Sequence, residues 1–194
     1  MSKAVMLSIR PKWCEKIISG EKTIEVRKTR PKLETSFKCY VYCTLQGCNE
    51  FFRVDLGGDV AKWNRGKWAD RKGNVIGEFT CDRIYKIDKD STDFLFKTGG
   101  LSVYKQAAEE KCGLCVAMTD DELHGYLGHC QGYGWHISNL KIYDTPKELS
   151  EFKTLCGVDA DCCACPYYNY AKIECDGRVI GHPPQSWCYV EAME

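Results

Sequence analysis

A short charged segment near the N-terminus carries the residue types best suited to chemistry. Residues 20–27 read Gly-Glu-Lys-Thr-Ile-Glu-Val-Arg, so an amine (Lys22), a carboxylate (Glu25) and a guanidinium (Arg27) follow one another closely. Successive side chains of a strand point to opposite faces, so Glu25 and Arg27 share a face while Lys22 stands at the preceding turn. Such a group can bind an anion and move a proton. The alternative is a solvated strand face with local ion pairs.

The elements around this segment follow from local sequence signals. Residues 4–9 predict a strand, Pro11 begins a helix, and Gly20 ends that helix in a left-handed conformation. Thr119 with Glu122 three residues later predicts the N-terminus of a second helix. A third short helix is predicted from Pro146 to Phe152. Further strands are predicted over residues 23–27, 39–45, 75–87 (as one strand or two), 134–143 and 187–191.

The order of these elements predicts the fold class. One strand and one helix are followed by many short strands with small helices between them, which favours an α+β fold around a small, mostly antiparallel β-sheet or β-barrel with flanking short helices. The 194 residues suit one domain spanning 1–194. The sequence contains no GxGxxG or GxxxxGK[ST] motif and no internal repeat, so the common nucleotide-binding loops are not expected.

Composition narrows the classes of partner. Lys plus Arg and Asp plus Glu each number 27, and this zero net charge excludes a generally polybasic protein. Residues 1–38 nevertheless hold ten Lys or Arg against four Glu, a basic segment that could attract phosphate. No apolar run is long enough for a membrane span, and residues near Met1 do not resemble a secretory signal. We therefore expect a cytoplasmic protein without a membrane partner.

Fourteen cysteines are unusual for such a chain, and five of them fall within residues 156–175. Cys162 and Cys165 form a C-x-x-C knuckle, which can supply two of the four thiolates of a tetrahedral structural zinc site. We predict that Cys156 and Cys175 supply the other two, within a cysteine-rich insertion over residues 154–182. The alternatives are free thiols, disulfides or an iron–sulfur cluster. A second candidate set comprises Cys112, Cys115, His124, His129 and Cys130.

The segment Gly20–Arg27 matches the pattern G-x-K-x-x-E-x-R, and several other short sequence motifs occur in a fixed order along the chain. They are Met6-Leu7-Ser8-Ile9-Arg10-Pro11, Val41-Tyr42 followed by Thr44, Gly77-Glu78-Phe79, Gly134-Trp135-His136-Ile137 and Pro183-Pro184-Gln185-Ser186-Trp187-Cys188-Tyr189-Val190. Together they resemble the ASCH domain family, in a bacterial and phage subgroup, from near residue 4 to near residue 190. This resemblance implies a PUA-like β-barrel whose signature residues line a cleft between barrel and helix.

The resemblance also implies a function. ASCH domains resemble nucleic-acid-binding modules, mostly of RNA, so the implied partner is RNA or a modified nucleotide. A small bacterial branch hydrolyses the acyl amide of N4-acetylcytidine with a lysine, a threonine and a glutamate, and ribonuclease activity has been attributed to another branch. Lys22 matches that lysine, but Glu25 stands where the nucleophilic threonine would be. The branch's glutamate corresponds to the region of Glu109 and Glu110.

Three readings of function follow. In the first, a basic cleft binds RNA. Glu25 accepts a hydrogen bond from the exocyclic amine of a base, and an unpaired base stacks on Trp135, Trp13 or Tyr42. The cations hold phosphates. In the second, the same cleft hydrolyses a modified nucleobase or an RNA phosphodiester, with Lys22 polarising the substrate and Glu25 acting as base. In the third, the cysteine-rich segment is a protein–protein adaptor. The predicted binding residues are Arg10, Lys12, Lys22, Glu25, Arg27, Lys28, Arg30 and Trp135.

Overall fold

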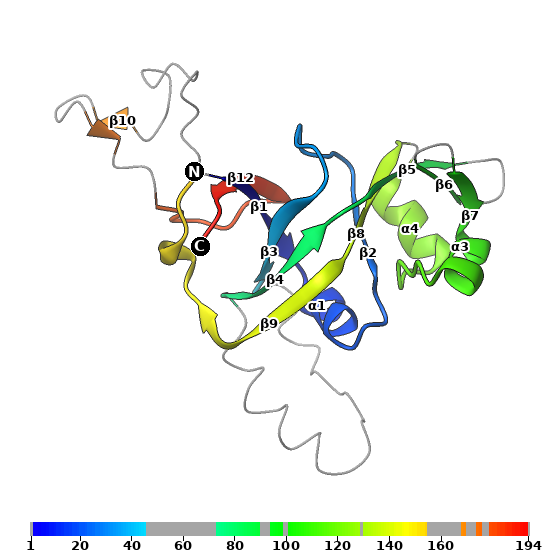
Figure 1. Ribbon diagram of the computed structural model, residues 1–194, viewed down its shortest axis with the longest axis horizontal. Helices are drawn as coiled ribbons and strands as arrows, with labels where there is room; N and C mark the ends of the chain where they lie inside the picture. The colour runs from blue at the N-terminus through cyan, green and yellow to red at the C-terminus, as the bar shows by residue number, and fades with distance from the viewer. Residues whose placement is uncertain are drawn as a thin grey trace, which may run out of the picture. The chain divides into compact units, whose positions relative to one another are not determined.

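The computed structural model describes residues 2–45, 73–89, 94–98, 101–128, 130–154, 168–169, 174–175 and 179–193. Its contacts divide the chain into two compact units, each built from separated segments. The first comprises Met1–Pro11, Lys38–Glu78 and Ile142–Glu194, and the second comprises Lys12–Phe37 and Phe79–Lys141. Short helices and many strands make up the described elements, as the predicted α+β class requires (Figure 1).

The first unit is organised around β1 (Lys3–Ile9), which pairs antiparallel with β12 (Trp187–Glu191) and parallel with β3 (Phe37–Cys43). The sheet order is β12-β1-β3-β4-β9, where β4 is Val75–Cys81 and β9 is Ser138–Lys147. Successive side chains of β1 are buried on both faces of the sheet, which explains why β1 is a nearly continuous apolar run. Apolar side chains of β1, β3 and β12 form the core of this unit together with residues such as Phe152 and Ile180.

The segment after β9 differs from the helix predicted between Pro146 and Phe152. Strand β9 continues through Pro146 to Lys147, and only Leu149–Glu151 forms a short 3₁₀ helix, η1. Proline lacks a backbone N–H, but β9 is an edge strand of its sheet, where that missing donor costs no ladder hydrogen bond. The sequence predicted that Pro146 begins a helix, and this prediction was wrong because Pro146 belongs to strand β9.

The second unit contains a five-stranded sheet of order β2-β8-β5-β6-β7. Its strands are β2 (Ile24–Arg27), β8 (Gly132–His136), β5 (Ile84–Lys89), β6 (Phe94–Thr98) and β7 (Leu101–Tyr104). The pairings β2–β8, β8–β5, β5–β6 and β6–β7 are all antiparallel. The stretch 75–87, predicted as one strand or two, forms the two strands β4 and β5. The stretch 134–143, predicted as a single strand, is divided between β8 and β9, so that prediction was wrong.

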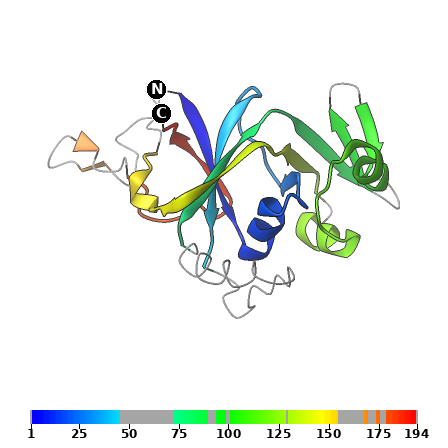
Figure 2. The same ribbon diagram turned by 60° about the horizontal axis from the view of Figure 1, so that its bottom comes forward.

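Three helices complete the second unit: α1 (Pro11–Ile18), α3 (Lys105–Cys112) and α4 (Asp120–Leu127). The capping box predicted at Thr119 and Glu122 is present, with hydrogen bonds in both directions. Residues of α3, α4 and the segment between them pack on one face of the sheet, against side chains such as Ile24, Ile87 and Phe96. Both views show these two helices lying against the strands of this sheet (Figures 1 and 2).

The predicted zinc ligands fall almost entirely outside the described residues. Cys156, Cys162 and Cys165 are not described, and Cys175 is described only as part of the backbone of β11 (Glu174–Cys175), which pairs with β10 (Tyr168–Asn169).

None of the helices in the described ranges combines the length and the apolar character needed to cross a membrane.

Candidate functional site

The position of Lys22 is set by the end of helix α1. Gly20 adopts φ +79°, a conformation that glycine reaches without a steric penalty, and its N–H donates to the Ile17 carbonyl at 3.1 Å. The Lys22 N–H then donates to the Lys16 carbonyl at 2.8 Å, which turns the chain from α1 toward β2. Sequence reasoning predicted this cap correctly, because it depends on one glycine and its immediate neighbours.

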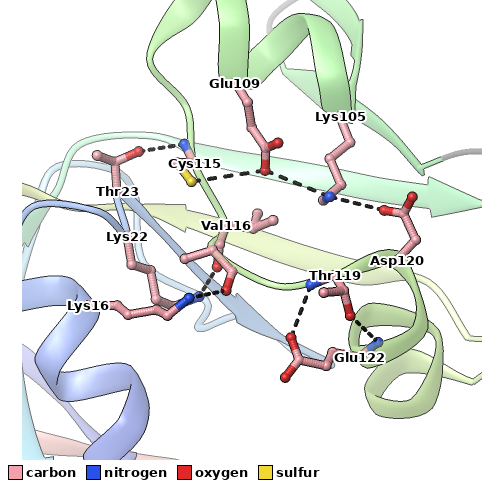
Figure 3. A network of polar contacts seen from close by, with 11 residues as sticks. Lys16, Lys22, Thr23, Lys105, Glu109, Cys115, Val116, Thr119, Asp120 and Glu122 are labelled. Atoms are coloured by element: carbon pink, nitrogen blue, oxygen red, sulfur yellow. Dashed lines mark hydrogen bonds and ion pairs between the residues drawn. The ribbon is translucent and has the colours of Figure 1, made fainter. Parts of the chain in front are cut away.

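The segment between α3 and α4 holds the start of β2. The carbonyl of Cys115 accepts hydrogen bonds from the N–H groups of Thr23 and Ile24, at 2.9 and 3.0 Å. The Thr23 hydroxyl donates to the Gly113 carbonyl at 2.9 Å and accepts from the Cys115 N–H at 2.8 Å. These contacts with Gly113 and Cys115 hold the backbone at the start of β2, from which the charged side chains project (Figure 3).

The same segment also binds two lysines through its carbonyl oxygens. Lys22 Nζ donates to the Val116 carbonyl at 2.6 Å, and Lys16 Nζ donates to the Ala117 carbonyl at 3.2 Å (Figure 3). Ala117 has a left-handed φ of 55°, which is strained for a residue with a Cβ atom. Sequence reasoning missed these carbonyl partners, because backbone oxygens carry no sequence signal and lie about a hundred positions further along the chain.

Lys22, Glu25 and Arg27 form one buried ion cluster, which we call the signature cluster. Glu25 Oε1 lies 3.0 Å from Arg27 Nη2, and Glu25 Oε2 lies 3.5 Å from Lys22 Nζ. Only 2% of Lys22, 6% of Glu25 and 5% of Arg27 is exposed. The two cations and one anion leave a formal surplus of one positive charge. The alternative of a solvated strand face is thus wrong for these three residues.

Burial changes the acid–base character of the cluster. Desolvation lowers the pKa of Lys22 below its ordinary value, because a buried ammonium loses its hydration, while the charge of Glu25 opposes this shift. The structure thereby favours an amine that releases its proton more readily than an exposed lysine does. Such an amine can hold a ligand as a cation or serve as a proton acceptor.

One oxygen of the cluster is left with an unused acceptor position. Glu25 Oε2 is buried and accepts no hydrogen bond from any described residue, and its contact with Lys22 is the long 3.5 Å ion pair. A buried carboxylate oxygen normally accepts one or more good hydrogen bonds, and leaving it without one costs free energy. This oxygen is therefore suited to accept an N–H or O–H from a ligand.

Trp13 is a partly exposed aromatic residue beside Lys22 of the signature cluster. Its half-buried ring lies 4.7 Å from Lys12 Nζ, 5.8 Å from Lys16 Nζ and 5.1 Å from Lys22 Nζ, measured to the ring centroid. Three ammonium groups around one indole give both positive charge and an aromatic surface in one place. Trp135, also predicted to stack a base, is 0% exposed and packs edge-on against Phe37, so it offers no exposed ring face.

The remaining predicted cations are at the surface. Lys12, Lys28 and Arg30 are exposed residues of the second unit; Lys12 pairs with Glu122 at 2.5 Å, and Lys28 Nζ lies 5.6 Å from the centre of the Tyr126 ring. Arg10 is also exposed but belongs to the first unit, as does the buried Tyr42. Of the predicted binding residues, Lys22, Glu25 and Arg27 are therefore in direct contact, whereas none of the ion pairs among the described residues joins these surface cations to Glu25.

Two members of the second cysteine set, His129 and the side chain of Cys112, lie outside the described residues. Among the described residues, no group of His, Cys, Asp and Glu side chains could hold a metal ion. Cys115 Sγ instead lies 4.0 Å from Glu109 Oε1, which is in turn 3.8 Å from Lys105 Nζ. Lys105 also pairs with Asp120 at 3.0 Å and so links α3 to the start of α4 (Figure 3). Glu109 therefore belongs to this polar chain.

No protein-family model matches the sequence, and no curated protein matches it. Solved structures do match. The ASCH protein of Zymomonas mobilis aligns with a TM-score of 0.52 and 15% identity over 97% of this chain and 87% of that one. A tyrosine-to-phenylalanine variant of it aligns with a TM-score of 0.52 and 15% identity over 98% and 91%. A serine-to-alanine variant aligns with a TM-score of 0.51 and 15% identity over 97% and 88%. This chain therefore has an ASCH-like fold, as the resemblance of its ordered sequence motifs implied.

Proposed function

We propose that this protein binds RNA, or a nucleotide derived from it, at the signature cluster. The observation that carries the proposal is the buried Glu25 carboxylate, held between Lys22 and Arg27 with one oxygen that no described donor satisfies. A carboxylate in this state is suited to the exocyclic amine of a base. The surplus positive charge of the cluster is suited to the phosphate that accompanies the base.

The surroundings support a nucleic acid rather than a small organic anion. Lys12, Lys28 and Arg30 are exposed on the same unit and add cations beyond those in contact with Glu25. Phosphate contacts of this kind supply sequence-independent affinity, while a base is recognised by hydrogen bonds and stacking. Trp13 provides the aromatic surface next to Lys22. The ASCH-like fold agrees with this proposal.

The test is a fluorescence anisotropy titration of a labelled single-stranded RNA at several salt concentrations. We expect the double substitution Lys28→Gln/Arg30→Gln to weaken binding without unfolding the protein, because both side chains are exposed. If both residues contact phosphates, the slope of log K against log salt becomes shallower by about 1.4, since each contact on a single strand contributes about 0.7.

A matched control carries the same change of charge elsewhere. Lys3→Gln/Lys147→Gln removes two cations from strands β1 and β9 of the first unit. We expect this variant to bind as the wild type does. A wild-type protein that binds neither RNA nor nucleotides would overturn the proposal, and equal losses in both double variants would reduce it to general charge attraction.

One observation favours a second candidate, a hydrolase acting in the same place. Burial lowers the pKa of Lys22, as expected for a lysine that exchanges protons during a reaction. Under this alternative, Lys22 polarises or protonates the substrate and Glu25 acts as the base. Chromatography of the titration mixtures distinguishes binding alone from hydrolysis. RNA fragments or a deacylated nucleoside appear only if there is turnover. In that case we expect Lys22→Ala to abolish the products while binding is retained.

We also propose a structural zinc ion bound by Cys156, Cys162, Cys165 and Cys175, which rests on ligand type and spacing in the sequence. Native mass spectrometry of protein purified under reducing conditions without added metal is expected to show one zinc per chain. Cys162→Ser/Cys165→Ser should abolish the adduct. A folded wild-type protein free of metal would contradict this assignment.

A further inference from the structure

The strand register of the second unit places a row of side chains across its whole sheet. Arg27 of β2 is opposite Tyr133 of β8, and Tyr133 is opposite Lys86 of β5. Lys86 is opposite Lys97 of β6, and Lys97 is opposite Ser102 of β7. Residues directly opposite each other in antiparallel strands have their side chains on the same face. Arg27 of the signature cluster is therefore the first member of a row that crosses every strand.

The other face of this sheet is already occupied. Ile24 and Val26 alternate with Glu25 and Arg27 along β2, and they pack in the core with residues of α3, α4 and the segment between them. Tyr85 and Ile87 of β5 and Phe94 and Phe96 of β6 belong to the same core. The row that begins at Arg27 thus lies on the face away from these helices.

The row becomes exposed with distance from β2. Arg27 is buried and Tyr133 is half-buried, whereas 45% of the Lys86 side chain and 44% of the Lys97 side chain are exposed. Ser102 is exposed as well. Cations and an aromatic ring therefore alternate at the start of the row, with the strongest exposure over β5, β6 and β7. This is the composition of surfaces that bind single-stranded nucleic acid, where charge follows the backbone and rings stack on bases.

Asp88 lies between the two exposed lysines and pairs with both. Its carboxylate lies 3.3 Å from Lys86 Nζ and 2.9 Å from Lys97 Nζ, and Asp88 belongs to the same face, two positions from Lys86. One carboxylate between two ammonium groups leaves a formal positive surplus on this face. Both ammonium groups lie within 3.3 Å of the same carboxylate, so one anion can contact both.

We propose that a single-stranded RNA bound at the signature cluster continues across this face, perpendicular to the strands. Its backbone phosphates contact Lys86 and Lys97, and a base packs against the ring of Tyr133. The inference rests on the proposed function and specifies that the ligand is a strand. Neighbouring strands lie about 4.8 Å apart, so the backbone of β6 is about 14 Å from that of β2. A single nucleotide bound at the cluster need not contact Lys97, whereas a longer strand can.

The test compares ligands of increasing length on the full-length protein. A nucleoside monophosphate, a dinucleotide and oligoribonucleotides of about four and about eight residues are titrated against the wild type, Lys86→Gln/Lys97→Gln and the control Lys3→Gln/Lys147→Gln. We expect the double variant to bind the monophosphate as the wild type does. It should lose about tenfold in affinity for the longest oligonucleotide, because two exposed phosphate contacts are removed. Tyr133→Leu should weaken only the longer ligands.

Each outcome separates the two proposals. A wild type that binds no member of the series overturns both of them. A wild type that binds the monophosphate but gains nothing with length, or a double variant that retains the full gain, overturns the path across the sheet and leaves the proposed function intact. Polyglutamate of similar length serves as a further probe: if it competes as well as RNA does, the face is a general site for acidic chains and the RNA assignment fails.

Discussion

Glu25→Ala is expected to lower the free energy of unfolding by about 3–5 kcal/mol, the largest loss of stability that we predict for one substitution in this protein. The reason is electrostatic. Alanine would leave the Lys22 ammonium and the Arg27 guanidinium buried next to each other without their shared counter-ion. Removing one partner of a buried ion cluster costs far more than the cluster contributes as a whole, because the remaining charges cannot recover their hydration.

Urea unfolding followed by circular dichroism under reducing conditions measures this loss. Glu21→Ala is a suitable control, since Glu21 is exposed and only accepts a hydrogen bond from the neighbouring Ser19 hydroxyl. We expect the control to change the free energy of unfolding by less than about 0.5 kcal/mol. A loss below about 1 kcal/mol for Glu25→Ala would show that Lys22 and Arg27 are solvated in solution, which contradicts the buried cluster.

The triple substitution Lys22→Met/Glu25→Leu/Arg27→Met is expected to separate stability from binding. It removes all three charges together and replaces them with apolar side chains of similar volume, an exchange that buried ion clusters often tolerate. We expect the free energy of unfolding to stay within about 2 kcal/mol of the wild type. The remaining loss arises because the Val116 carbonyl, which accepts a hydrogen bond from Lys22 in the wild type, has no donor in the variant. Affinity for RNA should nevertheless fall by about 10- to 100-fold, because the hydrogen-bond acceptor and the positive surplus are both lost.

Lys147→Met is the control for the triple variant, since this lysine takes part in an exposed pair with Glu151. It should change neither stability nor RNA affinity measurably. If the triple variant folds and still binds RNA with wild-type affinity, the signature cluster is a purely structural element, and binding must be sought elsewhere on the protein. If it is no more stable than Glu25→Ala, the apolar exchange has failed and Glu25→Gln with its charge-neutral amide is the variant to compare.

These two results would distinguish the roles of buried and exposed charge in the second unit. The signature cluster is buried, and the Val116 carbonyl holds Lys22 in place, so the cluster can select a ligand through hydrogen-bond geometry. Lys28, Arg30, Lys86 and Lys97 are at the surface, so they contribute mainly long-range attraction that salt screens. Specific recognition and salt-dependent affinity should accordingly respond to different substitutions.

Much of the fold could be predicted from the sequence because its signals are local. The cap at Gly20, the capping box at Thr119 and Glu122, and the alternation along β2 each depend on residues within one or two turns of chain. Their physical causes are a left-handed backbone, paired side-chain and backbone hydrogen bonds, and the two faces of a strand. Pro146 shows the limit of such signals, since its conformation was decided by the place of β9 at a sheet edge.

The sequence by itself determined which residues could do chemistry, since Lys22, Glu25 and Arg27 were identified from type and spacing. Only the tertiary structure decided that all three are buried, because the segment that covers Lys22 lies 94 positions away at Val116. It also decided that the half-buried Trp13, and not the fully buried Trp135 opposite Glu25, presents an aromatic ring that a base could reach. Burial and contact between distant segments depend on how sheets and helices pack, and spacing along one strand does not contain that information.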